Sequence, residues 1–143
     1  IMLSALPGTG KDFFIKKNYQ DVPVISLDAI RRENKISPTD KKGNGRVIQM
    51  AKEQARVFLR KKESFLWNAT NISRNLRTPL IDLFQSYGAK TKLIYLEVPH
   101  KKLMQQNRNR DFPVPQKVIE KMVSKLEVPS KWEAPTLEIH VSG

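Results

Sequence analysis

A short run rich in small residues, 5–11, follows an apolar segment and precedes a stretch with helical spacing. Gly8 and Gly10 would let the backbone curl so that several N–H groups point inward and form a nest for phosphate oxygens. The helix that follows would direct its positive end toward the same place, and Lys11 would reach the terminal phosphates. The sequence therefore predicts a phosphate-binding loop for a nucleotide, formed by Pro7, Gly8, Thr9, Gly10, Lys11 and Asp12.

Two positions of this loop differ from the common pattern. Ala5 stands where glycine is usual, and its small methyl group is tolerable there. Asp12 stands where a serine or threonine normally binds Mg²⁺, and Phe13 offers no hydroxyl group in compensation. Asp12 is thus the candidate metal ligand, directly or through water. The alternative is weak metal binding, as expected of a domain that binds a nucleotide without catalysis.

A carboxylate and a cation follow the second apolar segment, residues 22–26. Asp28 should lie at the same sheet edge as the loop, and Arg31, three residues later, would share one helix face with it. Phosphoryl transfer to a hydroxyl needs a carboxylate that takes the hydroxyl proton. It also needs a cation that fixes the nearest phosphate of the acceptor. Asp28 and Arg31 suit these roles, and the alternative is an N-cap aspartate paired with a surface arginine.

Arginines also precede a proline-rich hinge, Pro113-Val114-Pro115. The transition state of phosphoryl transfer carries negative charge on its equatorial oxygens, which arginines on a closing lid can stabilise. Arg108 and Arg110 are the candidates for this role, and a solvated helix end is the alternative.

The third apolar segment, residues 65–67, ends in a tryptophan that we expect in the core. Asn68 follows it, where many phosphate-loop enzymes carry an aspartate that holds Mg²⁺ through water. We expect Thr70 and Asn71 to contact the acceptor or to close the site. Further on, Arg74 and Arg77 would either contact nucleic acid or lie in solvent.

Apolar segments alternate with helix-like stretches along the whole chain. We expect strands at 1–3, 22–26, 65–67, 92–98 and 136–141, and helices at 11–17, 29–34, 47–62, 78–87, 100–110 and 115–126. Pro79 would lie in the first turn of its helix and Gly88 would end it, while residues 35–46 would form a loop. This alternation predicts an α/β fold with a central parallel sheet, helices on both faces and a short helical lid. Ligands then bind at the carboxyl ends of the strands.

Length and charge narrow the class of partner. The 143 residues fit one domain, which we expect to be excised from a longer protein, since the chain opens inside a strand. The formal net charge of +12 favours a polyanion. A loop carrying Arg32, Lys35, Lys41, Lys42 and Arg46 would line a funnel for a single strand, or would merely be solvated. The lack of cysteine suits a cytoplasmic protein, and no apolar run is long enough to cross a membrane.

Four sequence marks together resemble the polynucleotide 5′-hydroxyl kinase family, in particular the kinase domains of bacterial RNA-repair proteins. They are Leu6-Pro7-Gly8-Thr9-Gly10-Lys11, Leu27-Asp28-Ala29-Ile30-Arg31, Trp67-Asn68-Ala69-Thr70-Asn71 and Asn107-Arg108-Asn109-Arg110-Asp111-Phe112-Pro113-Val114-Pro115. The likeness covers nearly the whole chain.

The resemblance implies a P-loop NTPase kinase fold, ATP or another NTP as donor with Mg²⁺, and RNA or DNA with a 5′-hydroxyl end as acceptor. It also implies that Asp28 is the general base, that Arg31 grips the acceptor phosphate and that lid arginines act in catalysis. Attached repair domains would fit. Two alternatives remain: a small-molecule kinase on the same fold, and a non-catalytic module that binds nucleotide or RNA.

Overall fold

The computed structural model describes residues 1–7, 9–37, 39–109 and 114–141. Its elements follow one another as β1 (Met2–Ala5), α1 (Lys11–Asn18), β2 (Val24–Ser26), α2 (Leu27–Glu33), α3 (Lys41–Arg60), β3 (Leu66–Asn68), α4 (Arg74–Ser86), β4 (Lys92–Glu97), α5 (His100–Arg108), α6 (Gln116–Lys125) and β5 (Thr136–Val141). In the described part of the chain, no helix has the length and apolarity needed to cross a bilayer.

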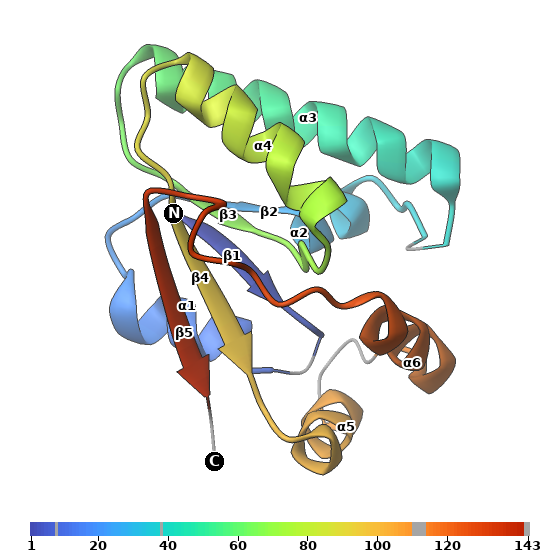
Figure 1. The fold of residues 1–143 in the computed structure, drawn as a ribbon. Helices are drawn as coiled ribbons and strands as arrows, with labels where there is room; N and C mark the ends of the chain where they lie inside the picture. Colours follow the sequence, from blue (N-terminus) through green and yellow to red (C-terminus); the bar gives the residue numbers. More distant parts are fainter. Residues whose placement is uncertain (8, 38, 110–113, 142–143) are drawn as a thin grey trace.

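The strands form a five-stranded sheet in the order β2-β3-β1-β4-β5, and every neighbouring pair is parallel. The expected α/β architecture is therefore confirmed. All strands point their carboxyl ends to one edge, so the segments that follow β1, β2 and β3 meet there (Figure 1). Strand β1 is central and buried along its whole length, which fixes the start of the loop that follows it.

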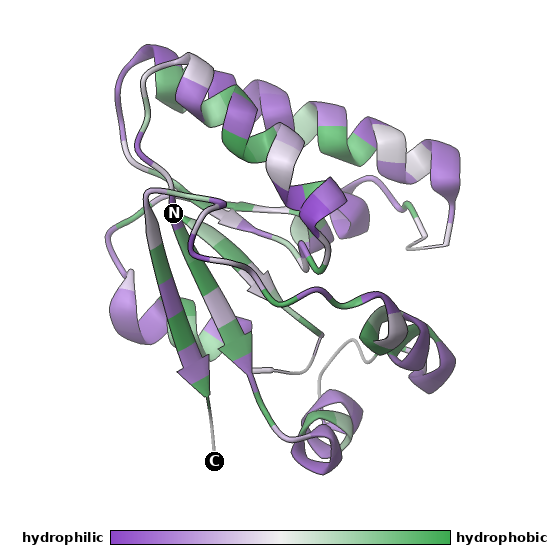
Figure 2. Cartoon of the chain, viewed as in Figure 1, coloured by the Kyte–Doolittle hydropathy of each residue, from purple (hydrophilic) through white to green (hydrophobic). Residues whose placement is uncertain are grey.

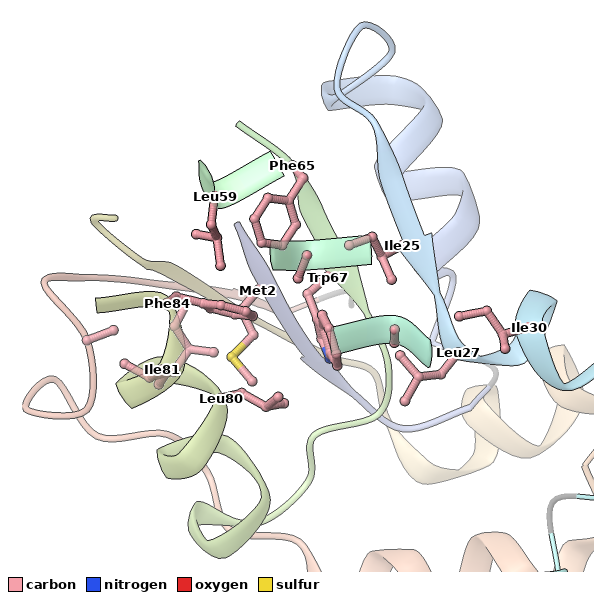
Figure 3. Packing of buried hydrophobic residues seen from close by; sticks show 14 of the residues in the cluster. Met2, Ile25, Leu27, Ile30, Leu59, Phe65, Trp67, Leu80, Ile81 and Phe84 are labelled. Carbon is pink, nitrogen blue, oxygen red and sulfur yellow. The ribbon is translucent and has the colours of Figure 1, made fainter. Parts of the chain in front are cut away.

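Helices cover both faces of this sheet (Figure 1). On one face α3 and α4 turn their apolar sides inward and their hydrophilic sides outward, as Figure 2 shows. The centre of this layer is Trp67, which is fully buried and packs near Phe84, Ile81 and Met2 (Figure 3). Trp67 is thus a core residue, as expected. On the other face α1 contributes Ile15 to a second cluster.

Helices α5 and α6 lie apart from the two layers, at the carboxyl end of β4 (Figure 1). A third apolar cluster joins them to the site edge, with Leu103 from α5 and Ile119 from α6 packed against Leu6 and Ile72. The hinge between the two helices is bridged as well, because Asn107 donates to the Val114 carbonyl at 2.7 Å and accepts from its N–H at 3.0 Å. The lid is therefore packed onto the segment that follows β1.

The expected loop at 35–46 is wrong, because α3 already begins at Lys41. Asp40 caps this helix through a hydrogen bond from the Gly43 N–H at 3.0 Å. Gly43 favoured a loop in the sequence, but its real constraint is space. A Cβ atom there would lie 2.4 Å from the Ile36 side chain.

Helix α4 begins at Arg74, earlier than expected, with Ser73 as its N-cap. Pro79 therefore lies inside the helix, and its expected place in the first turn is wrong. The end is as expected: Gly88 has φ +81°, and hydrogen bonds from the N–H groups of Gly88 and Ala89 satisfy the carbonyls of Gln85 and Phe84.

Arg77 neither lies in solvent nor is available to nucleic acid, contrary to both expectations. Its side chain is fully buried and pairs with Glu133, with Nε 2.8 Å from Oε1. The guanidinium also donates to the Asn71 carbonyl at 2.9 Å. The pair thus joins α4 to the segment that precedes β5 and to the loop that follows β3.

Candidate active site

A cavity of about 290 Å³ opens at the carboxyl edge of the sheet. Several parts of the chain contribute to it: the start of α1 with the residue before it, the end of β2 with α2, the end of β3 and the lid helix α5. The lining residues are Gly10, Lys11, Asp12, Phe13, Ser26, Asp28, Arg32, Asn68 and Gln106. This is the edge at which parallel α/β sheets bind ligands.

Of the predicted phosphate-loop residues, Gly10, Lys11 and Asp12 line this cavity. Gly10 has φ +88°, a left-handed conformation that glycine adopts without steric cost, and it directly precedes Lys11, the first residue of α1. Lys11 is buried, with 8% of its surface exposed. Thr9 Oγ1 donates to the Leu6 carbonyl at 2.9 Å, which closes the turn. Pro7 is buried beside it, whereas Gly8 lies outside the described residues.

The segment after β3 is fastened to β1. The Asn71 amide donates to the Leu3 carbonyl at 2.7 Å, and Ser4 Oγ donates to the Asn71 carbonyl at 2.8 Å. The Ala5 N–H also donates to the Thr70 carbonyl at 2.8 Å. This geometry gives the buried Asn71 side chain a structural role in place of the expected acceptor contact. For the Thr70 hydroxyl, the acceptor contact stays a prediction.

Asp28 lies in the first turn of α2 and lines the cavity. It is not the N-cap, because Ser26 Oγ accepts the capping hydrogen bond from the Ala29 N–H at 3.2 Å. The Asp28 carboxylate pairs instead with the Arg31 guanidinium. Arg31 also donates to Asn44 Oδ1 on α3 at 3.1 Å, so a second helix fixes its position.

Arg32, rather than Arg31, is the arginine that lines the cavity. Sequence reasoning counted it only among the cations of the supposed loop. The signal was present, since residues three and four positions after Asp28 both share its face of a helix. The spacing could not show which arginine lines the cavity. The structure shows that Arg31 is held by Asn44, whereas Arg32 lines the cavity.

The lid contributes differently from what we expected. Arg108 is exposed at the end of α5 and lines a separate cavity of about 180 Å³, with Met104 and Gln116 among its neighbours. It is not among the residues that line the cavity of Lys11 and Asp28. Gln106, two residues earlier in α5, lines that cavity. Arg110 lies outside the described residues.

Oxygen ligands for Mg²⁺ are present but few. Asp12 is exposed at the cavity wall, and Asp28 lies in the same cavity. Among the residues that the structure describes, no group of three or more acidic or histidine side chains is arranged to hold a metal by itself. Mg²⁺ in phosphoryl-transfer sites commonly uses one or two carboxylates together with substrate phosphates and waters. The donor set therefore fits a metal ion that arrives with a nucleotide.

A second cavity, of about 350 Å³, shares Leu6 and Thr9 with the phosphate loop and extends between β4, α5 and α6. Its lining is largely apolar, with a hydroxyl and a carboxylate on β4. Burial and the neighbouring Glu97 carboxylate raise the pKa of Tyr95 to about 12, so its hydroxyl stays protonated and donates to Glu97 at 3.2 Å.

A larger cavity of about 540 Å³ lies at the opposite edge of the sheet, beside Ile1, Phe65 and Thr91. These residues precede or begin β1, β3 and β4, so the cavity is at the amino ends of the strands. It holds none of the phosphate-loop residues, and we assign the chemistry to the smaller cavity.

A family model described as an AAA domain, AAA_33, matches residues 1–129. The chain belongs to this AAA domain family. Solved structures resemble the AAA domain over 98% of its length. They include a putative kinase from Chloroflexus aurantiacus (TM-score 0.75, 16% identity, 85% of that chain covered). Another is a sugar kinase from Janibacter (TM-score 0.72, 13% identity, 83% of that chain covered). A third is Chaetomium thermophilum Kti12 in complex with ADP-AlF3 (TM-score 0.68, 16% identity, 87% of that chain covered). The AAA domain thus has a P-loop kinase-like fold.

Proposed function

We propose that this AAA domain is a polynucleotide 5′-kinase, which transfers the γ-phosphate of ATP or another NTP to the 5′-hydroxyl end of RNA or DNA. The observation that carries the proposal is that Lys11 and Asp28 line one cavity. One supplies a cation for the donor phosphates, and the other supplies a base for the acceptor hydroxyl. Such an activity would serve nucleic-acid repair in the cytoplasm, alone or beside attached repair domains.

The reaction is an in-line displacement. Asp28 accepts the proton of the 5′-hydroxyl while that oxygen attacks the γ-phosphorus, and the bond to the bridging oxygen of the β-phosphate breaks. Lys11 and the N–H groups at the start of α1 hold the phosphates. Arg31 orients the Asp28 carboxylate through their ion pair. Mg²⁺, held by Asp12 and the phosphates, would neutralise the developing charge.

The apolar cavity beside the loop would take the donor base. It adjoins the phosphate loop through Leu6 and Thr9, and ligand cavities are mostly apolar with a few polar groups that set orientation. Asn68 and Gln106 line the cavity of Asp28, where the acceptor would enter.

A polynucleotide acceptor is supported by charge. The net charge is +12, and exposed cations follow α2: Lys35, Lys41 and Lys42 lie before or at the start of α3. Arg32 lines the cavity itself. These side chains would contact the phosphates that follow the 5′-terminal nucleotide.

The sugar kinase among the similar structures favours a second candidate, a kinase for a small alcohol on the same fold. The third candidate is a nucleotide-binding module without transfer, motivated by Asp12 and Asn68 in the metal region. These alternatives differ from the proposal in the acceptor that becomes phosphorylated, or in the absence of transfer.

The test is transfer of labelled γ-phosphate from ATP to a short RNA with a 5′-hydroxyl, in the presence of Mg²⁺. We expect Asp28→Ala to lower the rate by about 10²–10⁴-fold with ATP binding intact, since it removes the base. Lys11→Ala should weaken ATP binding as well. Asp21→Ala, at an exposed carboxylate before β2, is the matched control and should transfer normally. Label on sugars alone, or ATP binding without transfer under Mg²⁺ or Mn²⁺, would contradict the proposal.

A further inference from the structure

Four buried side-chain atoms in the described residues have no hydrogen-bond partner: Trp67 Nε1, Asn68 Oδ1, Thr91 Oγ1 and Gln106 Oε1. Asn68 and Gln106 both line the cavity that holds Lys11 and Asp28. Asn68 is more than nine-tenths buried, with 8% of its surface exposed. Buried polar groups are normally paired, so two unpaired oxygens on residues that line one cavity indicate a ligand.

The chemistry of the two atoms narrows that ligand. Both are amide carbonyl oxygens, which accept hydrogen bonds and cannot donate them. The phosphate groups of a nucleotide also only accept, so in this orientation of the two amides phosphate oxygens do not pair with them. The partner must carry hydrogen-bond donors and lie in the cavity that Asp28 lines. Neutral donors suit two uncharged oxygens, and hydroxyl groups are the donors that an acceptor alcohol brings.

Their positions on the fold fit this assignment. Asn68 is the last residue of β3, a buried strand at the centre of the site edge, so its side chain is rigidly placed. Gln106 belongs to lid helix α5, which packs onto the loop after β1. The two residues therefore reach the cavity from the sheet and from the lid. A sugar with two or more free hydroxyl groups has a donor for each of their oxygens, and a sugar with one has a donor for either.

We propose that Asn68 and Gln106 form a sugar subsite, in which their amide oxygens accept hydrogen bonds from hydroxyl groups on the sugar whose own hydroxyl is phosphorylated. The inference rests on the proposed phosphoryl transfer at this cavity and adds a substrate class to it. For a polynucleotide the sugar is the 5′-terminal ribose, whose one free ring hydroxyl is the 2′-hydroxyl that DNA lacks, and this hydroxyl donates to one of the two oxygens. The same chemistry would recognise a free polyol.

The experiment compares Asn68→Leu and Gln106→Met with the wild-type chain on paired acceptors. The pairs are a 5′-hydroxyl RNA and the same RNA with a 2′-deoxy first nucleotide, and a free sugar with its deoxy analogue. Thr91→Val is the matched control, because Thr91 Oγ1 is also buried and unpartnered but lines the cavity at the opposite sheet edge. Thermal unfolding checks that each variant folds.

We expect both site variants to raise KM for the free sugar, and at least one of them to raise KM for the ribose-ended acceptor, by about three- to tenfold, the size of one neutral hydrogen bond. The deoxy acceptor should already have the higher KM, and the variants should change it little. Thr91→Val should leave both values unchanged. The inference is overturned if KM rises equally for both members of a pair or does not rise at all. It is also overturned if the variants only require more Mg²⁺.

Failure of the proposed function is separable from failure of this inference. If the free sugar is phosphorylated and the RNA is not, the polynucleotide proposal fails and the sugar pair decides the subsite. If no acceptor is phosphorylated, calorimetric binding of the same acceptors to the ADP-bound protein decides it. Binding of a hydroxylated compound that weakens in Asn68→Leu supports the subsite; absence of any such binding overturns it.

Discussion

At the scale of single residues, the site depends on the neighbours that position the Asp28 carboxylate. Because Ser26 caps α2, the Asp28 carboxylate is not used for the helix end and can face the cavity. Arg31 then pairs with it, and Asn44 fixes Arg31 from α3. We infer that the two neighbouring arginines differ in role: Arg31 positions the base, and Arg32 meets the acceptor.

This division predicts different kinetic effects of two substitutions. Arg32→Ala should raise KM for a 5′-hydroxyl oligonucleotide by about 10–100-fold, the cost of a charge-assisted hydrogen bond, with kcat changed little. Arg31→Ala should mainly lower kcat, because Asp28 loses the contact that orients it. Steady-state kinetics on oligonucleotide and ATP separately measure both effects, with Lys90→Ala, an exposed cation at the opposite sheet edge, as the control. A KM effect confined to Arg31→Ala would reverse the assignment.

At the scale of elements, the buried pair of Arg77 and Glu133 connects parts of the fold that are distant in sequence. Burial alone would raise the pKa of Glu133, but hydrogen bonds from Arg77 and from the Ser130 N–H, with the charge of Arg77, bring it below its ordinary value of 4.5. Through the Asn71 carbonyl, the same guanidinium supports the loop after β3. The pair therefore stabilises the loop after β3, which lies at the edge of the sheet that carries the site.

Removing one partner of this pair should be costly. We expect Arg77→Leu to lower the free energy of unfolding by about 3–5 kcal/mol, because it leaves the Glu133 charge buried and unpaired. The double variant with Glu133→Leu should lose less than the single variant does. Urea unfolding at neutral pH measures both. Equal losses in the two variants would show that packing of the arginine, and not its charge, matters.

The lowered pKa of Glu133 adds a dependence on pH with a definite sign. A carboxyl group whose pKa is lower in the folded state contributes stability above its unfolded value, and this stability is lost as pH falls through the folded value. Stability should therefore decline below pH 4.5 in the wild-type chain. The double variant should decline less steeply over the same range, which urea unfolding at a series of pH values measures.

The elements also show what sequence can predict. The phosphate loop, the strand alternation and the Gly88 helix end depend on neighbouring residues, and each was predictable. The start of α3 was not predictable, because a glycine at position 43 is typical of a loop. Only the structure shows that Gly43 is required for its close packing against Ile36. The burial of Arg77 was not predictable either, since its partner Glu133 lies 56 residues away in the chain. Contacts of that range come from the fold.

At the scale of the whole molecule, charge and topology act together. The parallel sheet brings the segments after β1, β2 and β3 to one edge, and Figure 1 shows the start of α3 beside α2 at this edge. Exposed lysines at 35, 41 and 42 therefore lie on the acceptor side of the site. With a net charge of +12, the domain should attract a polyanion and direct it to that side.

The positive charge near α3 should show in the salt dependence of binding. A single strand bound through its phosphates releases counterions. The slope of log affinity against log salt concentration is therefore about −0.7 per phosphate contact. Replacing Lys35, Lys41 and Lys42 by alanine should therefore reduce the salt slope of oligonucleotide binding by about 2, with ATP binding unchanged. Replacing the exposed Lys61, Lys62 and Lys90, near the opposite sheet edge, removes the same charge and should change the slope far less. Equal changes in the two variants would mean that net charge alone attracts the strand.

A smaller slope in the first variant alone would mean that the strand contacts the start of α3 on its way to Asp28. A small-molecule acceptor is too short to make that contact.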